Sequence, residues 1–288
     1  GLHVKITPFP SADFPEWVAT FEFFETPQPG CEKHDYDDLY ALLPFRQCNR
    51  TKATETISTE KLEQIRSFAA GVAPFNLVLL TDKAKIGQLG TIAGTIDRLR
   101  FTQKAYHSEL VKEIRWTPEE AARTKDGIDL DLIDLKASEK VGFELAKQWP
   151  LMDMVASLKG GRAIEKMTRE LLETDSAIGL ITTPEISPLA YFNGGRYYQR
   201  LWLYCTKIGI DWHPIPATLY AFLRLDHEKN AAMPEAMQLE LTPLNQQFQA
   251  LFSTSPGTAG ILLMRLTPAG KLPLASYRRP VEEVLFFD

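Results

Sequence analysis

The sequence predicts an α+β fold in which helices flank a sheet, and three observations lead to this prediction. Short apolar runs of strand length lie at residues 75–81, 177–182 and 260–266. Segments with apolar residues at helical spacing separate these runs. The chain has 288 residues and is 44% hydrophobic, so it can bury a substantial core in one large domain or two small ones.

The first 25 residues predict two strands. Residues 2–7 and 17–25 alternate apolar and polar side chains, and prolines between them mark a turn, so we expect a hairpin. A chain that starts on a strand suggests that an upstream segment has been removed. We therefore expect residues 1–36 to be N-terminal strands that end a preceding lobe, and residues 37–288 to form one domain.

A segment rich in hydrogen-bond donors, residues 43–65, leads into the first long helix. Thr56 or Ser58 can cap that helix, which we expect over residues 58–71 because its apolar residues recur at helical spacing. Upstream, residues 37–43 predict a short amphipathic helical turn that ends at Pro44.

Arg46 and Arg50 lie between these two helical segments, and their role has two interpretations. Guanidinium groups match the geometry of phosphate oxygens, so the pair can hold a phosphate-bearing ligand. Alternatively, both arginines are surface charges that pair with Asp37 and Asp38. Charge spacing alone favours the surface ion pairs.

The middle of the chain predicts mostly helix. Residues 82–110 indicate one long helix or a helix pair, and residues 141–159 and 162–173 indicate two more. Between them, residues 116–135 contain a helix start at Thr117 and a turn near Gly127. This turn-rich segment is either a cover over a site or an ordinary surface excursion.

The C-terminal third begins with the helix that carries most information, residues 188–209. Apolar residues cover most of its circumference, so it should be central and packed on several sides, and Gly209 should end it. Two prolines within residues 210–219 favour an irregular loop.

Composition and motifs exclude several functions. Net charge is −5 with acids and bases interspersed, which argues against nucleic-acid binding. The three cysteines and five histidines are isolated, so no metal site or catalytic triad is expected. No apolar run is long enough to span a membrane and no signal peptide is visible, so we expect a cytoplasmic protein.

Four motifs, taken in order, make the chain from about Asp37 onward similar to the FMN-dependent nitroreductase family. They are RQCNR at 46–50, GGRYYQRLWL at 194–203, Gly209-Ile210 followed by Pro214-Ile215, and RRPVEEV at 278–284. The resemblance implies a mostly antiparallel sheet around a long central helix.

The resemblance also implies which residues bind FMN. The phosphate and ribityl chain would contact Arg46, Cys48, Arg50 and Arg278 or Arg279. Cys48 stands where the family has serine or threonine, so a weak thiol donor replaces a hydroxyl. A backbone N–H would reach flavin N5 from the segment Ile215-Pro216-Ala217, where Pro216 lacks an N–H and leaves Ala217 as the donor.

A further flavin contact of the family, a serine-asparagine element, is missing after the first helix. Residues 71–76 run directly into the next strand. In family dimers this element comes from the partner subunit. In fused members two lobes share one chain, and this sequence resembles the C-terminal lobe of such a fusion. The missing element would then lie upstream of Leu2.

Two functions follow as hypotheses. The first is an FMN oxidoreductase that passes electrons from NAD(P)H to a nitro, quinone or similar conjugated acceptor, with no dedicated catalytic side chain. The second is a degenerate, non-catalytic binding or partner domain that does not hold FMN. We expect a small-molecule acceptor, a homodimer or an upstream lobe as partner, and neither nucleic acid nor membrane.

Overall fold

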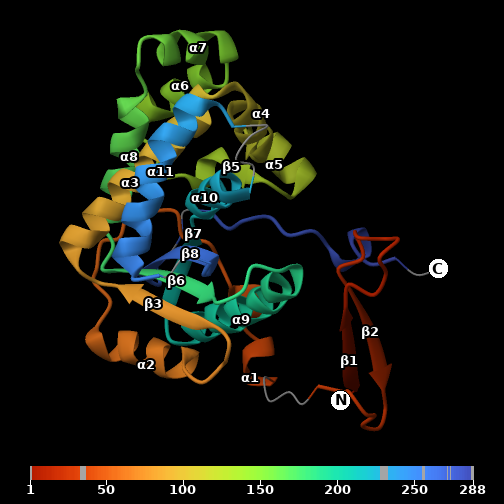
Figure 1. Cartoon of the computed structure of the whole chain (residues 1–288). Coiled ribbons are helices and arrows are strands. Elements are labelled where there is room, and N and C mark those ends of the chain that lie inside the picture. The colour runs from red at the N-terminus through yellow and green to blue at the C-terminus, as the bar shows by residue number, and fades with distance from the viewer. Residues whose placement is uncertain are drawn as a thin grey trace.

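A four-stranded antiparallel sheet forms the centre of the molecule (Figure 1). The computed structural model describes residues 2–32, 37–227, 233–254, 257–270, 272 and 274–286, without the side chains of residues 37 and 227. The strands lie in the order β3 (Asn76–Leu80), β6 (Ala177–Thr183), β8 (Ala259–Pro268) and β7 (Ile210–Pro214). All three expected apolar strands are therefore present, and the α+β prediction is confirmed.

One face of the sheet is covered by four helices, α3 (Lys83–Thr102), α8 (Arg162–Glu173), α10 (Ala217–His227) and α11 (Glu235–Phe252). Successive strand residues point to opposite faces. Ile178, Leu180 and Leu263 accordingly pack in the same buried cluster as these helices. Arg265, two residues beyond Leu263, points to this same helix-covered face.

The opposite face is covered by α2 (Thr59–Ala69) and α9 (Pro188–Lys207), as Figure 1 shows. The Ser58 side chain caps α2 by accepting a hydrogen bond from the Lys61 N–H. The Tyr197 hydroxyl donates to the Ala69 carbonyl at 2.9 Å, which joins the two helices. The expected central helix is confirmed, and Gly209 ends it with a φ of 72°.

A smaller group of elements extends from the end of α3. It comprises α4 (Lys104–Glu113), β4 (Ile114–Arg115), α5 (Pro118–Thr124), β5 (Ile128–Asp129), the 3-10 helix η2 (Leu130–Leu132), α6 (Ala137–Ala146) and α7 (Trp149–Ser157). β4 and β5 pair in parallel. Phe101, Trp116 and Met152 bury a separate apolar cluster here.

Three expectations about helices and loops are wrong. Residues 141–159 form parts of two helices, α6 and α7, because the chain turns at residues 147–148 just before Pro150. Residues 210–219 are not an irregular loop but β7 and the start of α10. The turn expected to stop at Pro44 instead divides into α1 (Asp37–Tyr40) and a 3-10 helix η1 (Leu43–Phe45) that contains this proline.

Two strands also differ from expectation in their place in the sheet. Pro214 fits in β7 because β7 is an edge strand, where a missing N–H breaks no ladder on its open side. β3 is the other edge strand, and its residues are mostly half-buried rather than buried. Helix α11 was not anticipated at all.

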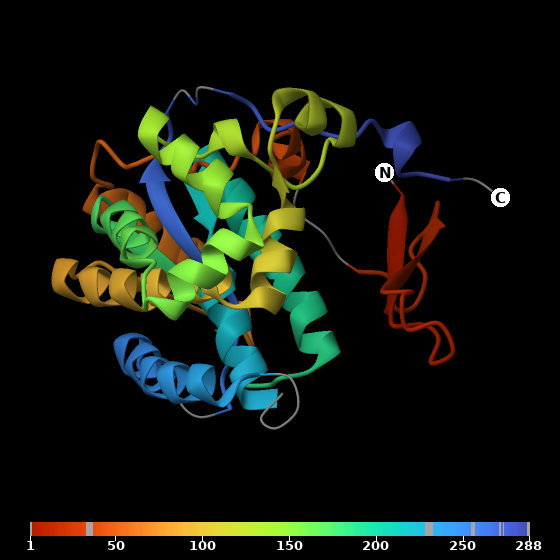
Figure 2. The ribbon, with the colours of Figure 1, turned by 90° about the horizontal axis from the view of Figure 1, so that it is seen from above.

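The expected N-terminal hairpin is present, formed by β1 (His3–Pro8) and β2 (Ala19–Phe24). It stands apart from the central sheet in both views (Figures 1 and 2). Its contacts with α9 include the ring pair Phe9–Phe192, with centroids 6.2 Å apart, and the ion pair Glu32–Arg196. The chain ends in a 3-10 helix, η3 (Val281–Glu283), on the same side.

Helices α3 and α8 pack unusually closely because glycines face α8. A Cβ at Gly94 would lie 2.5 Å from the Glu165 carbonyl oxygen, and one at Gly90 would lie 3.2 Å from the Arg169 Cα. One turn after Gly94 in α3, the Arg98 side chain binds two carboxylates. Its Nε donates to Glu165 at 2.5 Å, and its Nη2 donates to Glu240 of α11. The two glycines thus set the separation of two helices that also line the cavity described next.

Among the helices of the described residues, none combines the length and the apolar character needed to cross a bilayer.

Candidate functional site

A cavity of about 990 Å³ lies on the side of the sheet that α3, α8 and α10 cover. Most of its lining is apolar, with Ile96 of α3, Leu171 of α8 and Ile215 after β7 among the wall residues. Small-molecule sites are typically of this kind, concave and apolar with a few polar groups. The polar groups therefore decide what the cavity can bind.

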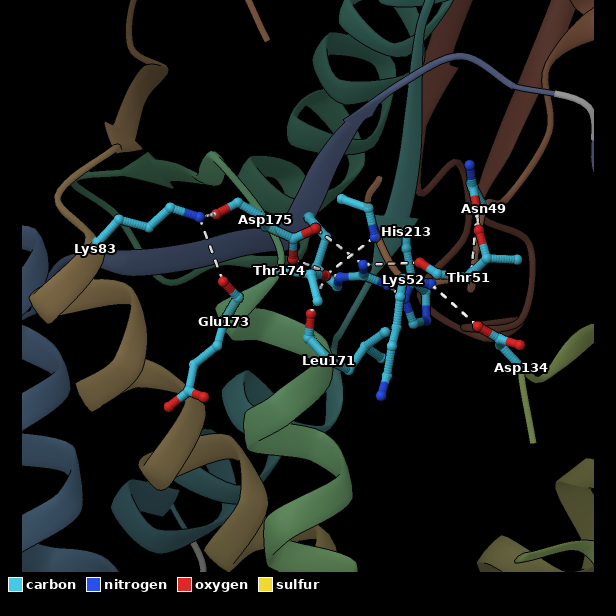
Figure 3. A network of polar contacts seen from close by, with 12 residues as sticks. Asn49, Thr51, Lys52, Lys83, Asp134, Leu171, Glu173, Thr174, Asp175 and His213 are labelled. Atoms are coloured by element: carbon cyan, nitrogen blue, oxygen red, sulfur yellow. Dashed lines mark hydrogen bonds and ion pairs between the residues drawn. The ribbon is translucent and has the colours of Figure 1, made fainter. Parts of the chain in front are cut away.

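The end of the RQCNR motif and the residues that follow it reach this cavity, where Arg50 and Lys52 line the wall. Three hydrogen bonds hold the segment in place. The Asn49 N–H donates to the Trp212 carbonyl at 2.8 Å, and the Ala53 N–H donates to the Thr174 hydroxyl at 3.0 Å. The Lys52 N–H donates to a carboxylate oxygen of Asp134 at 3.4 Å (Figure 3).

The start of the segment is fixed to β7 through Asp211. This carboxylate accepts from the Gln47 amide at 3.1 and 3.2 Å and from the Asn49 amide at 3.3 Å. The Gly270 N–H also donates to it at 3.4 Å. Burial raises the pKa of Asp211, and these donors act in the opposite direction. The backbone that carries Arg50 is therefore held rigidly.

The side chains of Arg50 and Lys52 themselves are uncommitted. Arg50 is half-buried, and neither its guanidinium nor the Lys52 ammonium makes a hydrogen bond or ion pair with any residue that the structure describes. Half-buried arginines normally find an acidic partner or acceptor. These two cations are available to an anionic ligand.

A fully buried ion pair lies behind this wall. The Arg265 guanidinium binds the Asp175 carboxylate through two parallel hydrogen bonds of 2.6 and 2.9 Å, and both side chains are 0% exposed. Arg265 also donates to the Thr51 carbonyl at 3.0 Å and to Nδ1 of His213 at 3.1 Å. Burial raises the pKa of Asp175 to about 6, and Arg265 limits that rise.

Figure 3 shows how residues from several elements meet in this network. Lys83, at the start of α3, donates to the backbone carbonyls of Asp175 at 2.5 Å and Glu173 at 3.3 Å. His213, at the end of β7, lines the cavity. Burial lowers the pKa of His213 well below 6.5, and the positive charges of Arg265 and Arg50 lower it further. His213 is therefore neutral near pH 7.

The sequence indicated Arg46 and Cys48 as ligand contacts, but both lie outside the cavity lining. The Arg46 guanidinium stacks over the Trp202 ring at 4.3 Å from its centroid, and burial together with Arg278 lowers its pKa. Cys48 forms a backbone bridge with Trp212 at the sheet edge. Burial raises the pKa of its thiol.

Arg278 and Arg279 are likewise absent from the lining. Arg278 donates to the Arg46 carbonyl at 2.5 Å, so it supports the RQCNR segment from outside. Arg279 pairs with Asp126 at 2.7 Å. The alternative in which Asp38 pairs with Arg46 or Arg50 is wrong, because Asp38 pairs with Lys207 at 2.5 Å. The Asp37 side chain lies outside the described residues.

Ala217 lines the cavity together with Pro216 and is the first residue of α10. Backbone N–H groups in the first turn of a helix have no acceptor within that helix. The Ala217 N–H makes no hydrogen bond within the part of the chain that the structure describes, so it can serve as a donor at the cavity wall. Of the six residues indicated by the sequence, Arg50 and Ala217 are the two that line the cavity.

The turn-rich segment 116–135 contributes to the same cavity through Ile128, Ile133, Asp134 and Leu135. β5, within the segment, pairs with β4, which directly precedes the segment, and Arg115 binds Asp126 at 2.6 Å. The segment is thus an ordered part of the wall.

Sequence reasoning missed Lys52, His213, Arg265 and Asp175. One signal was present: Arg265 interrupts an otherwise apolar strand, and a charge in such a strand needs a buried partner. Nothing local in the sequence linked it to Asp175 or His213. Within the described ranges, no cluster of histidine, cysteine, aspartate and glutamate could hold a metal ion.

No protein-family model matches the chain. A protein of Mycobacterium tuberculosis (strain CDC 1551 / Oshkosh), named "Uncharacterized protein MT1398", is 27% identical over 244 residues. The alignment covers 84% of this chain and 33% of that protein, so the chain spans about a third of the relative's length.

Two of the solved structures to which the chain is similar are a nitroreductase-like protein and a nitroreductase. A nitroreductase-like family protein from Bacillus cereus aligns with 89% of this chain and 99% of its own, at 12% identity and a TM-score of 0.43. A nitroreductase with bound FMN from Desulfitobacterium hafniense DCB-2 aligns with 88% of this chain and 99% of its own, at 11% identity and a TM-score of 0.47.

Proposed function

We propose that the cavity binds FMN and that the chain is a flavin-dependent oxidoreductase. In this proposal, electrons pass from NAD(P)H to a nitro, quinone or similar conjugated acceptor. The observation that carries it is the Arg50 guanidinium, which lines a largely apolar cavity and has no partner among the described residues. A ligand with an anionic end and a flat apolar body fits that combination.

The cavity fits FMN in size, and Arg50 and Lys52 supply positive charge for its phosphate. A cavity of about 990 Å³ lies at the upper end of the range of small-molecule sites, roughly 300–1,000 Å³. Arg50 and Lys52 would hold the phosphate, and the apolar walls would enclose the ring. The Ala217 N–H would donate to flavin N5. When bound, FMN supplies the hydride and electron chemistry, while the protein supplies position and a dry site.

The other indicated residues would act indirectly. Arg46, Cys48 and Arg278 would anchor the segment that carries Arg50, through the Trp202 stack, the Trp212 bridge and the Arg46 carbonyl. Arg279, paired with Asp126, would hold residues 116–135 as a cover that keeps water from the ring.

A second candidate function is a non-catalytic binding or partner domain that keeps the fold without FMN. The favouring observation is that Arg46, Cys48 and both C-terminal arginines are engaged with protein groups rather than with the cavity. A serine-asparagine flavin contact would, under the first proposal, come from a second copy of the chain or from an upstream lobe.

Titration with FMN and with riboflavin tests the first proposal, read by quenching of flavin fluorescence. Riboflavin lacks the phosphate, so it separates phosphate binding from ring binding. We expect Arg50→Gln to weaken FMN binding by about 10- to 100-fold, since a hydrogen bond to a charged group contributes about 1.5–3 kcal/mol. Riboflavin binding should not change.

The matched control is Arg66→Gln on α2, a half-exposed arginine paired with Glu63 at 3.5 Å. It removes the same charge away from the cavity and should leave both affinities unchanged. If the unaltered chain binds neither flavin at millimolar concentration, the non-catalytic function is favoured.

A further inference from the structure

His213 is a cavity residue that the proposed function leaves without a role. It lines the cavity near Arg50, whose charge lowers its pKa, and it contacts the buried Arg265. A buried ion pair costs several kcal/mol of desolvation per ion and is weak evidence of added stability. The Asp175–Arg265 pair therefore matters here through the neighbours that it orients.

The chemistry of arginine fixes the histidine tautomer. A guanidinium has only donors and stays protonated in proteins. In the 3.1 Å contact between Arg265 Nη1 and His213 Nδ1, the histidine nitrogen must therefore accept. A neutral imidazole that accepts at Nδ1 carries its proton at Nε2. His213 is thus a hydrogen-bond donor through Nε2.

The orientation of Arg265 is itself fixed. Two bonds to Asp175 and one to the Thr51 carbonyl use the other guanidinium nitrogens, so Nη1 remains directed at His213. In addition, Thr51 lies directly between Arg50 and Lys52 in the sequence. The same guanidinium therefore positions both the histidine and the backbone that carries the two free cations.

The Nε2 proton has no acceptor in the part of the chain that the structure describes. The charged groups that act on His213 are the buried Arg265, which is bound to Asp175, and Arg50; Lys52 and Asp134 line the same cavity. Two free cations and one neutral donor at a single wall favour an oxygen anion over a cation or an apolar group.

We propose that His213 Nε2–H and the Arg50 guanidinium together bind an oxygen of a phosphate monoester, with the Asp175–Arg265 pair as the positioning element for His213. This inference rests on the proposed function, in which that phosphate belongs to FMN. His213 needs no proton uptake to act, since its proton is already at Nε2. At this wall the phosphate would then be bound by the positive charge of Arg50 and by a hydrogen bond from the neutral His213 Nε2–H.

Two substitutions separate the two nitrogens of the ring. In His213→Asn the side-chain oxygen can take the place of Nδ1 as acceptor for Arg265, while the donor at the Nε2 position is lost. In His213→Gln the amide N–H reaches the Nε2 position. We expect His213→Asn to weaken FMN binding about tenfold, without effect on riboflavin, and His213→Gln to restore most of the loss.

Imidazole ¹⁵N NMR gives a readout that needs neither flavin nor activity. We expect His213 as the Nε2–H tautomer near pH 7, because burial lowers its pKa well below 6.5. Inorganic phosphate at millimolar concentration should shift the Nε2 signal in the unaltered chain and not in Arg50→Gln. His3, at the exposed hairpin, serves as the internal reference signal.

The outcomes separate this inference from the proposed function. If FMN does not bind but phosphate shifts the His213 signal through Arg50, the phosphate site stands and the flavin function fails. If FMN binds and His213→Asn weakens FMN and riboflavin equally, or weakens neither, the inference is overturned. An Nδ1–H tautomer, or an Nε2 signal that neither phosphate nor FMN moves, also overturns it.

Discussion

Arg265 and Arg50 both lower the pKa of His213, yet their surroundings are opposite. Arg265 is 0% exposed, and its guanidinium donates hydrogen bonds to Asp175, Thr51 and His213. Arg50 lines the cavity and, among the described residues, has no partner. A buried charge with complete partners organises structure, whereas a charge left open at a cavity is available for binding. Substitutions at the two positions should therefore affect different properties.

The largest effect should follow loss of the Arg265 charge. Arg265→Met leaves the Asp175 carboxylate buried without its counter-charge, which should lower the free energy of unfolding by about 3–5 kcal/mol. Urea unfolding followed by circular dichroism measures this. The double variant Asp175→Leu/Arg265→Met removes both charges and should recover most of the loss, because apolar replacement of a whole buried pair is often neutral.

The same variant has a defined pH dependence. Asp175 has a pKa of about 6 in the folded chain and 3.8 as its reference value, so its contribution to stability is greatest below about pH 4 and is lost as pH rises through 6. Without Arg265 the folded pKa rises further and the loss continues above pH 6. The deficit of Arg265→Met should thus grow between about pH 6 and 8; a constant deficit would contradict this assignment.

A smaller effect belongs to the histidine between the two arginines. The pKa of His213 is lowered on folding, so the unfolded chain binds more protons below pH 6.5 and stability falls as pH decreases there. Between about pH 6.5 and 5.5 the loss should be no more than about 1.4 kcal/mol, the free energy that corresponds to one pKa unit. His213→Asn lacks it, so the unaltered chain should lose more stability over that interval; parallel pH profiles would show that folding does not lower the pKa of His213.

The smallest effect should separate Arg46 from Arg50, four residues apart in one motif. Arg46→Gln removes the stack on Trp202 and should cost about 0.5–1 kcal/mol of stability, with FMN affinity changed less than twofold. Arg50→Gln should do the reverse. Paired unfolding and titration curves of the two variants measure both quantities, and a large affinity loss in Arg46→Gln would return Arg46 to the binding site.

Local signals in the sequence were sufficient for most of the fold. The Ser58 cap, the apolar run 177–182 and the stop at Gly209 each follow from short-range physics and are present in the structure. Residues 210–219 were predicted as a loop because they contain two prolines, which are rare in central strands. β7 is an edge strand, where a proline is tolerated. Position within a sheet is a non-local property, so the sequence pattern could not supply it.

The candidate site was predictable only in part, for a related reason. Arg50 and Ala217 were found through motif order, and they line the cavity. His213 was set aside as a lone histidine. Its role depends on Arg265, which lies 52 residues after His213 in the chain, and on Asp175, which lies 90 residues before Arg265. Contacts over such separations arise from strand pairing between β6, β8 and β7 and leave no local trace.

The glycines of α3 have a consequence for ligand selection. Gly90 and Gly94 let α8 approach α3, and residues of both helices, Ile96 and Leu171 among them, form cavity walls. A methyl group at Gly94 would collide with the Glu165 carbonyl and push α8 outward. The internal width of the cavity is thus governed by residues buried in a helix–helix seam. A glycine-to-alanine substitution between the two helices would therefore change the size of ligand that the cavity accepts, without replacing any side chain that lines the cavity.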